Sequence, residues 1–161
     1  MVLMNWDKAT DIILFASFAV LTVLVALGFY QWISRKSLRK VDRTLLWAPL
    51  PLALMAATYV IFDKFLVLNV RPDGSGEPSF PSTHVMVVAT IFCLAVLILP
   101  KYLKKPAYIT LDILMLILLI LTAVGRVLAN QHCVSDVIGG LVFAAVFIVI
   151  YYLIIRRPQH A

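Results

Sequence analysis

Charged residues are scarce in this chain of 161 residues, because Asp, Glu, Lys and Arg make up only 14% of it while hydrophobic residues make up 63%. In an ordinary soluble domain about a quarter of the residues are charged and about half are apolar. The scarcity excludes a soluble globular protein and indicates a polytopic membrane protein. We expect a single domain over residues 1–161, since this length suits one compact bundle and leaves no room for a second soluble domain.

Cysteine is also scarce, with Cys93 inside an apolar run and Cys133 beside a histidine. This spacing forms neither a metal-binding pattern nor a disulfide framework, so we expect two free thiols. The N-terminus lacks the basic stretch, short apolar core and small-residue cleavage site of a secretory signal peptide, and we expect no cleaved signal. The net charge of +6 fits membrane orientation better than nucleic acid, so no nucleic-acid partner is predicted.

What the chain does contain is five apolar runs separated by short polar segments. The first run has 22 residues without a charge, enough to cross a hydrocarbon core of about 30 Å. Ser82 is a suitable N-cap for the third helix, and Asn130 for the fifth. The sequence therefore predicts an all-α fold, a polytopic membrane bundle of five transmembrane helices. These cover residues 12–33, 45–62 with a continuation toward 68, 85–99, 108–124 and 137–155.

Most basic residues fall on one side of this five-helix topology. Ten of the 14 Lys and Arg residues follow the first, third and fifth runs. Because basic loops stay in the cytoplasm, the pattern predicts an external N-terminus and a cytoplasmic C-terminus in a multi-pass protein of the cell (inner) membrane. The outer side keeps Lys8, Lys64, Arg71 and Arg126. Charges near the hydrocarbon layer are costly unless they are paired or functional, so the last three require another explanation.

A cation, an imidazole and a carboxylate lie together between the fourth and fifth runs. Arg126 ends the fourth run, and His132 and Asp136 are four residues apart. They share one helical face, one turn apart, if Asn130 caps the fifth helix. This spacing lets the carboxylate orient the imidazole. Free backbone N–H groups in the first turn of a helix favour a bound anion, so we expect a phosphate-handling site.

Other residues on the predicted outer side could complete the pocket. Lys64 and Arg71 are seven residues apart, or two helical turns, and face one pocket if the second helix persists that far. His84 stands two residues after Ser82, at the start of the third helix. Two outer hairpins thus converge on one place. A phosphate group, with its spread negative charge, fits such a pocket best.

These residues resemble the three-part signature of the type 2 phosphatidic acid phosphatase superfamily, the integral-membrane lipid phosphate phosphatases. The resemblance implies a hydrolase, independent of metal and cofactor, that removes the terminal phosphate of a lipid phosphate or lipid pyrophosphate such as undecaprenyl diphosphate. The chain departs from the family at Thr83, where glycine is usual, and at Gly125, where serine is usual. Gly125 lacks the hydroxyl of a serine, which predicts altered contacts with the phosphate. The motifs, within residues 64–136, read Lys64-(six residues)-Arg71-Pro72, Pro81-Ser82-Thr83-His84 and Arg126-(five residues)-His132-(three residues)-Asp136.

The resemblance also implies a role for each matching residue. His132 is the nucleophile that forms a phosphohistidine, Asp136 orients it, and His84 is the general acid. The partner is a lipid phosphate or polyprenyl diphosphate within the membrane, and the oligomeric state stays open. The oxygens of the phosphate are held by Lys64, Arg71, Ser82, Thr83 and Arg126.

Other interpretations of the same residues stay open. A lipid phosphotransferase would form the same phosphohistidine but deliver the phosphate to a lipid or sugar acceptor. Two histidines and a carboxylate could form a facial metal site, although the adjacent cations would repel a divalent metal. A non-catalytic binding or transport protein with a vestigial site is the third alternative.

Overall fold

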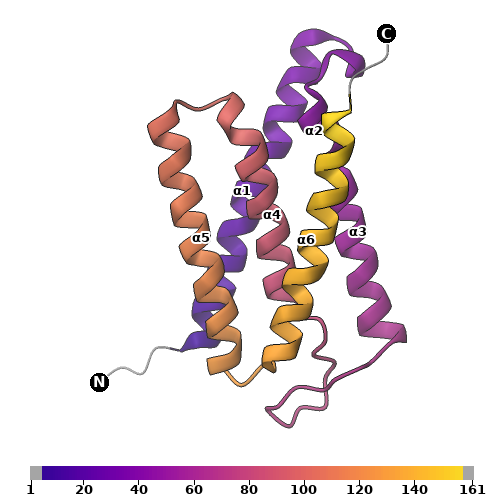
Figure 1. Cartoon of the computed structure of the whole chain (residues 1–161), viewed down its shortest axis with the longest axis vertical. Helices are drawn as coiled ribbons and strands as arrows, with labels where there is room; N and C mark the ends of the chain where they lie inside the picture. The colour runs from indigo at the N-terminus through magenta and orange to yellow at the C-terminus, as the bar shows by residue number, and fades with distance from the viewer. Residues whose placement is uncertain (1–4, 158–161) are drawn as a thin grey trace.

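A computed structural model describes residues 5–157 as a bundle of long helices that run side by side (Figure 1). Five helical segments in this range are long and apolar enough to cross a membrane, which confirms the predicted all-α, multi-pass membrane fold. The segments are α1 (Trp6–Arg35), α2 (Arg43–Trp47) with α3 (Pro49–Val60) and the π-helix η2 (Ile61–Phe65), α4 (Thr83–Ile98) with η3 (Leu99–Lys101), α5 (Lys105–Leu128) and α6 (Val134–Arg156), and the 3-10 turn η1 (Leu38–Lys40) lies in the first loop.

The helix α1 begins six residues before its apolar run, because its polar start is capped. The side chain of Asn5 accepts a hydrogen bond from the backbone N–H of Lys8 at 3.2 Å, which satisfies one of the free N–H groups of the first turn. Asp7 lies in the same turn, where its charge suits the positive end of the helix dipole. Asp7 and Asp11 are therefore carried on a helix.

The second crossing consists of three pieces and ends earlier than its apolar pattern suggests. Pro49 starts α3, where its missing N–H costs little. The π-helix η2 closes at Leu66, whose N–H donates to the carbonyl of Ile61 at 2.9 Å. The predicted continuation past Phe62 is therefore confirmed as far as Phe65, but the helical segment does not reach Leu68.

The segment 66–82 is a loop that extends beyond the ends of the helices (Figure 1). Its backbone pairs with itself, because the N–H of Arg71 donates to the carbonyl of Glu77 and the N–H of Ser79 donates to the carbonyl of Asn69, both at 2.9 Å. These bonds compete with a helix for the same backbone groups. They explain why the second helix does not persist to residue 71.

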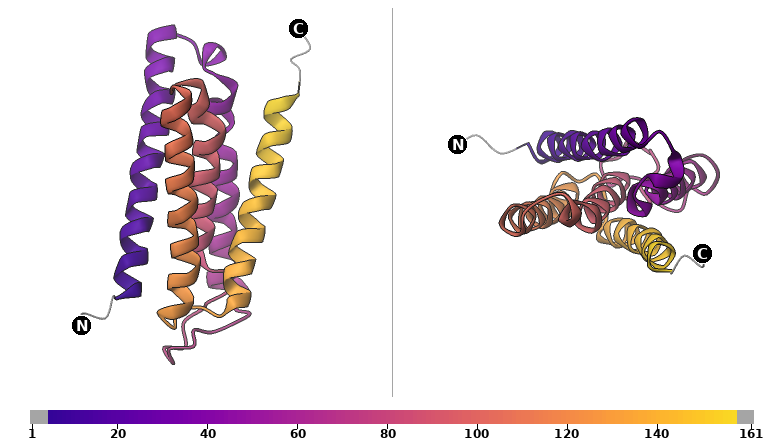
Figure 2. Two further views of the ribbon diagram at one scale, coloured as in Figure 1. Left: turned by 60° about the vertical axis from the view of Figure 1, so that its left-hand side comes forward. Right: turned by 90° about the horizontal axis from the view of Figure 1, so that it is seen from above.

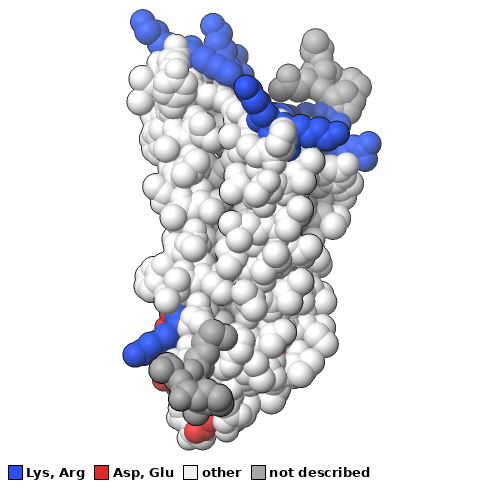
Figure 3. Space-filling view, turned by 90° about the vertical axis from the view of Figure 1, so that its left-hand side faces the viewer, with Lys and Arg blue, Asp and Glu red and all other residues white. Residues whose placement is uncertain are grey.

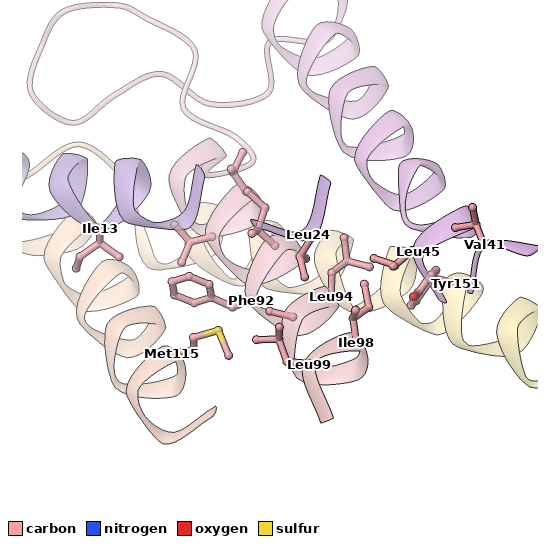
Figure 4. Packing of buried hydrophobic residues seen from close by; sticks show 14 residues of the cluster. Ile13, Leu24, Val41, Leu45, Phe92, Leu94, Ile98, Leu99, Met115 and Tyr151 are labelled. Carbon is pink, nitrogen blue, oxygen red and sulfur yellow. The ribbon is translucent and has the colours of Figure 1, made fainter. Parts of the chain in front are cut away.

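The helix α4 is the central element of the bundle, with the other long helices around it (Figure 2). In its most apolar window 61% of the residues are buried, against 11–22% in the other four crossings, which keep wide apolar faces exposed. Leu24 of α1, Met115 of α5 and Tyr151 of α6 pack in one cluster with Phe92 and Ile98 of α4 (Figure 4). In lipid, close packing of this kind supplies much of the attraction between helices.

The two ends of the bundle differ in charge. Lys and Arg side chains gather at the end that holds the α1–α2 and α4–α5 connections and the end of α6 (Figure 3). An apolar cavity of about 320 Å³ lies toward this basic end, between α1 and the α2–α3 segment. The opposite end holds the start of α1, the loop 66–82 and the α5–α6 connection. The orientation of the two ends across a membrane stays a prediction.

Candidate active site

Three parts of the chain that are distant in sequence meet at the end opposite the basic side chains (Figures 1 and 2). They are the start of α1, the loop 66–82 with the start of α4, and the end of α5 with the start of α6. The start of α4 and the start of α6 approach each other closely through their backbones. A Cβ atom on Gly140 would lie 2.7 Å from the carbonyl oxygen of Ser82, so only glycine lets α6 approach α4 this closely. The N–H of Ser82 also donates to the carbonyl of Asp136 at 2.9 Å.

His132 and Asp136 face each other, as their spacing predicts. Nδ1 of His132 lies 3.8 Å from Oδ2 of Asp136, which is an ion-pair distance and too long for a hydrogen bond. The predicted cap is wrong, because Cys133 is the N-cap of α6, and His132 precedes the helix. Asn130 instead has a positive φ of 58°, a left-handed conformation that asparagine tolerates better than most residues, and serves the turn after α5.

Asp136 is held through both carboxylate oxygens. Oδ2 accepts a hydrogen bond from the backbone N–H of Cys133 at 3.0 Å, as part of a capping box. Oδ1 accepts a hydrogen bond from Nδ2 of Asn69 at 2.7 Å. Asn69 belongs to the loop 66–82, so this loop helps to fix the orientation of the carboxylate that faces His132.

The environment of His132 keeps its imidazole neutral at pH 7. Burial lowers the pKa of His132 to about 4, and the positive charges of Arg126 and Arg71 act in the same direction. Asp136 and a backbone hydrogen bond with Ser79 oppose this shift and only partly offset it. A neutral imidazole has a lone pair on one nitrogen, which is the state needed for nucleophilic attack.

Arg126 is almost fully buried at the end of α5 and is held by α1. Its Nη1 donates to Oδ1 of Asp7 at 2.7 Å and to the hydroxyl of Thr10 at 3.4 Å. The preceding residue permits this approach, because a Cβ atom on Gly125 would lie 2.6 Å from Cγ2 of Thr10. The space that a serine would need at position 125 is thus filled by α1, and the hydroxyl of Thr10 lies beside the guanidinium instead.

Arg71 reaches the site from the loop 66–82. Its Nη1 donates to Oε1 of Gln131 at 3.0 Å and forms an ion pair with Oε2 of Glu77 at 2.8 Å. Gln131 also donates through Nε2 to Oδ2 of Asp73 at 3.3 Å. Because Gln131 directly precedes His132, these bonds tie the basic residue of the loop to the turn that carries the histidine.

His84 lies in the first turn of α4 and also contacts α1. Its Nε2 lies 2.9 Å from Oδ1 of Asp11. Ser82 occupies the predicted N-cap position of α4, but its side chain makes no capping hydrogen bond. Its hydroxyl is buried and has no hydrogen-bond partner within residues 5–157, so it is free to bind a ligand. Thr83 is partly buried and lines a small cleft between η2, the loop 66–82 and α4.

Lys64 makes no contact with Arg71 in the described part of the chain. Its side chain is 68% exposed, and Nζ pairs with Oδ2 of the neighbouring Asp63 at 2.6 Å. The expected arrangement of Lys64 and Arg71 on one helical face is wrong, because the helical segment ends at Phe65. A role for Lys64 in phosphate binding stays a prediction.

Four residues of this cluster escaped the sequence analysis: Asp7, Asp11, Asn69 and Gln131. The only signal for Asp7 and Asp11 was that they lie one helical turn apart, just before the first apolar run. Each meets a basic partner from a helix at least 73 residues further along the chain, and no local pattern identifies such a partner. Asn69 and Gln131 lie in loops, where polar residues are expected whether or not they have a function.

The charged groups of the cluster lie in pairs. Within residues 5–157 no group of three or more His, Cys, Asp or Glu side chains is arranged to hold a metal ion. The two histidines face different carboxylates, His84 that of Asp11 and His132 that of Asp136. Two guanidinium groups stand nearby and suit an anionic ligand.

The fold defines a polytopic membrane protein with a cluster of charged residues at one end of its bundle. The sequence model of the PAP2 superfamily matches residues 58–159, nearly two thirds of the chain. The chain therefore belongs to the PAP2 superfamily.

Among solved structures, the chain is similar to the crystal structure of the first transmembrane PAP2 type phosphatidylglycerolphosphate phosphatase from Bacillus subtilis. The TM-score is 0.74, and the match covers 100% of this chain and 81% of that chain at 19% sequence identity. At this identity the likeness shows the transmembrane PAP2 fold. No curated protein sequence matches the chain.

Proposed function

We propose that this protein is a membrane phosphatase that hydrolyses the terminal phosphate of a lipid phosphate or lipid pyrophosphate through a phosphohistidine at His132. The observation that carries the proposal is the buried, neutral His132, 3.8 Å from Asp136 and within reach of the charges of Arg126 and Arg71. A neutral imidazole can attack phosphorus, and two guanidinium groups can neutralise the phosphate under attack. Membership of the PAP2 superfamily supports a phosphatase.

In the first step Nε2 of His132, the nitrogen that does not face Asp136, attacks phosphorus while the bond from phosphorus to the leaving oxygen breaks. His84 gives a proton to that oxygen. Asp136 stabilises the positive charge that develops on the ring of His132. In the second step His84 takes a proton from a water molecule, whose oxygen attacks phosphorus. The phosphorus–nitrogen bond then breaks and inorganic phosphate leaves.

The phosphate oxygens are bound by Arg71 and Arg126, as charge neutralisation in phosphoryl transfer requires. The free hydroxyl of Ser82 and the hydroxyl and N–H of Thr83 at the start of α4 complete the cradle. Lys64 is proposed as a further phosphate ligand at the rim. Because these groups can neutralise the phosphate without a divalent cation, we propose a reaction that is independent of metal.

The leaving group in this proposal is the lipid side of the substrate, since the site lies at one end of a bundle whose outer faces are apolar. Undecaprenyl diphosphate is the first candidate, by family analogy alone. Phosphatidylglycerol phosphate is the second, because the structural neighbour from Bacillus subtilis is described as a phosphatase of that lipid. The positive-inside rule supports an inner-membrane protein whose site faces the periplasm or outside and whose C-terminus is cytoplasmic.

Phosphate release in detergent solution tests the proposed reaction. Wild-type protein, His132→Ala and Asp112→Asn are assayed with undecaprenyl diphosphate, phosphatidylglycerol phosphate and phosphatidic acid, with a chelator present throughout. Asp112 lies near the opposite end of α5 and provides a matched control carboxylate. We expect release by the wild type and the control, and a loss of about 10³-fold or more in His132→Ala. Full activity of His132→Ala would refute the phosphohistidine.

A trapping experiment separates hydrolysis from transfer. With a ³²P-labelled substrate, rapid quenching should leave label on the wild-type protein that survives alkali and is lost in acid, as expected for phosphohistidine, and no label on His132→Ala. A phosphotransferase would release little free phosphate into water and much more transfer product once a lipid or sugar acceptor is added. We expect free phosphate as the main product without any acceptor.

A further inference from the structure

The helix α1 brings a carboxylate to the histidine that serves as general acid in the proposed function. Oδ1 of Asp11 lies 2.9 Å from Nε2 of His84, within hydrogen-bond distance. The side chain of His84 is 20% exposed and that of Asp11 is 45% exposed. The contact therefore lies at the edge of the site, where water and substrate can both reach it.

The two histidines of the cluster are oriented in complementary ways. His132 turns Nδ1 toward Asp136, and His84 turns Nε2 toward Asp11. The hydrogen bond of His84 goes through Nε2, whereas Nδ1 of His132 is buried without a hydrogen-bond partner in the described part of the chain. Each ring thus faces one carboxylate with one nitrogen, and a carboxylate in this position selects the tautomer and stabilises the imidazolium.

Three features hold α1 in the position that makes this contact. Asn5 caps the helix so that Asp11 lies in regular helical structure. Asp7, one turn earlier on the same face, pairs with the buried Arg126 at 2.7 Å. Thr10 packs into the space that the absent side chain of Gly125 leaves open. The contact is therefore built into the interface between α1, α4 and α5.

We propose that Asp11 is a positioning residue for the general acid, and that it completes a second histidine–carboxylate pair. Its carboxylate accepts the Nε2–H of His84 and directs Nδ1–H of the protonated ring toward the leaving oxygen, which takes that proton as its bond to phosphorus breaks. Asp11 lies outside the segment 58–159 that matches the PAP2 superfamily. The first helix is thus a functional part of the site. This inference rests on the proposed phosphatase function.

A comparison of two substrates with different leaving groups tests this role of Asp11. An alkyl phosphate such as dodecyl phosphate has a poor leaving group that needs a proton, whereas p-nitrophenyl phosphate has a good one that does not. We expect Asp11→Asn to lower kcat about 10- to 100-fold on dodecyl phosphate, because general acid catalysis contributes about 10²- to 10⁴-fold. On p-nitrophenyl phosphate its kcat should fall less than threefold, and KM should change little on either substrate. Asp11→Glu should restore part of the loss.

Two other variants show what a different role would look like. Asp7→Asn acts on Arg126, a phosphate ligand in the proposal, and should slow both substrates by the same factor. Asp112→Asn, on the far part of α5, should leave both rates unchanged. Equal losses on both substrates in Asp11→Asn, or no loss on either, would overturn the inference even though the wild type hydrolyses both.

A measurement without turnover keeps this test separate from that of the phosphatase function. In protein labelled with ¹⁵N-histidine, Asp11→Asn should shift the Nε2 resonance of His84 by several parts per million and leave that of His132 in place. An unchanged resonance would refute the contact. A wild type that releases no phosphate, together with a shifted resonance, would refute the phosphatase function and retain the pair of Asp11 and His84.

Discussion

Replacing Gly125 by serine, the usual residue of the family at this position, should push α1 away from the candidate site. A Cβ atom there would lie 2.6 Å from Cγ2 of Thr10 and 3.2 Å from Cε3 of Trp6, whereas carbon atoms in contact prefer about 3.5–4.0 Å. The helix must therefore move by roughly 1 Å. Overpacking of this kind costs about 1–3 kcal/mol, which lowers the unfolding midpoint by roughly 2–12 °C for a chain of this length.

The same displacement should reduce activity. It would lengthen the contact between Asp7 and Arg126 from 2.7 Å and the contact between Asp11 and His84 from 2.9 Å, so that neither remains a hydrogen bond. Misplacing catalytic groups by about 1 Å can cost about 10²-fold in rate. We therefore expect Gly125→Ser to lose stability and kcat together.

Thermal unfolding in detergent and phosphate release measure these effects, and two further variants make the reasoning specific. Thr10→Ser removes Cγ2 but keeps the hydroxyl, so in the Gly125→Ser background it should recover at least half of the lost stability. Gly28→Ser is the matched control, since a Cβ atom on Gly28 meets nothing within 4 Å. Wild-type stability and activity in Gly125→Ser, or additive effects of the two substitutions, would refute the reasoning.

Three further outcomes follow from the site. The ¹⁵N resonances of His132 should titrate near pH 4, where burial and Arg126 place its pKa, and an inflection near pH 6.5 would contradict this prediction. Because this folded-state pKa lies below the ordinary value of 6.5, the contribution of His132 to the free energy of unfolding is lost as the pH falls from 6.5 toward 4. Asn69→Ala leaves Oδ1 of Asp136 without its 2.7 Å partner, so unfolding should become about 1–3 kcal/mol easier and kcat should fall, as melting curves and phosphate release would measure. Lys64→Met should raise KM for the lipid phosphate less than Arg71→Met does, because Lys64 is exposed and pairs with its neighbour. An equal or larger effect of Lys64→Met would contradict this prediction.

The helical ends show where the sequence patterns lose their power to predict. The apolar cores of all five crossings could be predicted, because the membrane interior leaves the backbone no alternative to helical hydrogen bonds. The ends are polar, and capping decides them: Asn5 extends α1 beyond its apolar run, and Cys133 caps α6 in place of Asn130. The second crossing ends early because the loop backbone pairs Arg71 with Glu77.

The motif residues show the same division within the candidate site. The spacing of His132 and Asp136 implied that the two side chains face each other on one helix, and they do face each other although His132 precedes α6. The spacing of Lys64 and Arg71 implied a shared pocket only if a helix joined them, and that helix ends before residue 71. Local spacing predicted the contact over four residues of the chain, and failed over seven residues that pass through a loop.

By itself, the amino-acid sequence determined an all-α bundle of five membrane-crossing helices and the order of three phosphatase-like motifs, since lipid forces long apolar runs into helices and spacing within a helix is regular. Only the tertiary structure decided which residues of the first helix contact the basic residues of the candidate site. Asp7 and Asp11 of α1 meet Arg126 and His84 because Gly125 leaves room for the first helix to approach. Such contacts depend on how helices distant in sequence pack, and no local pattern of residues predicts them.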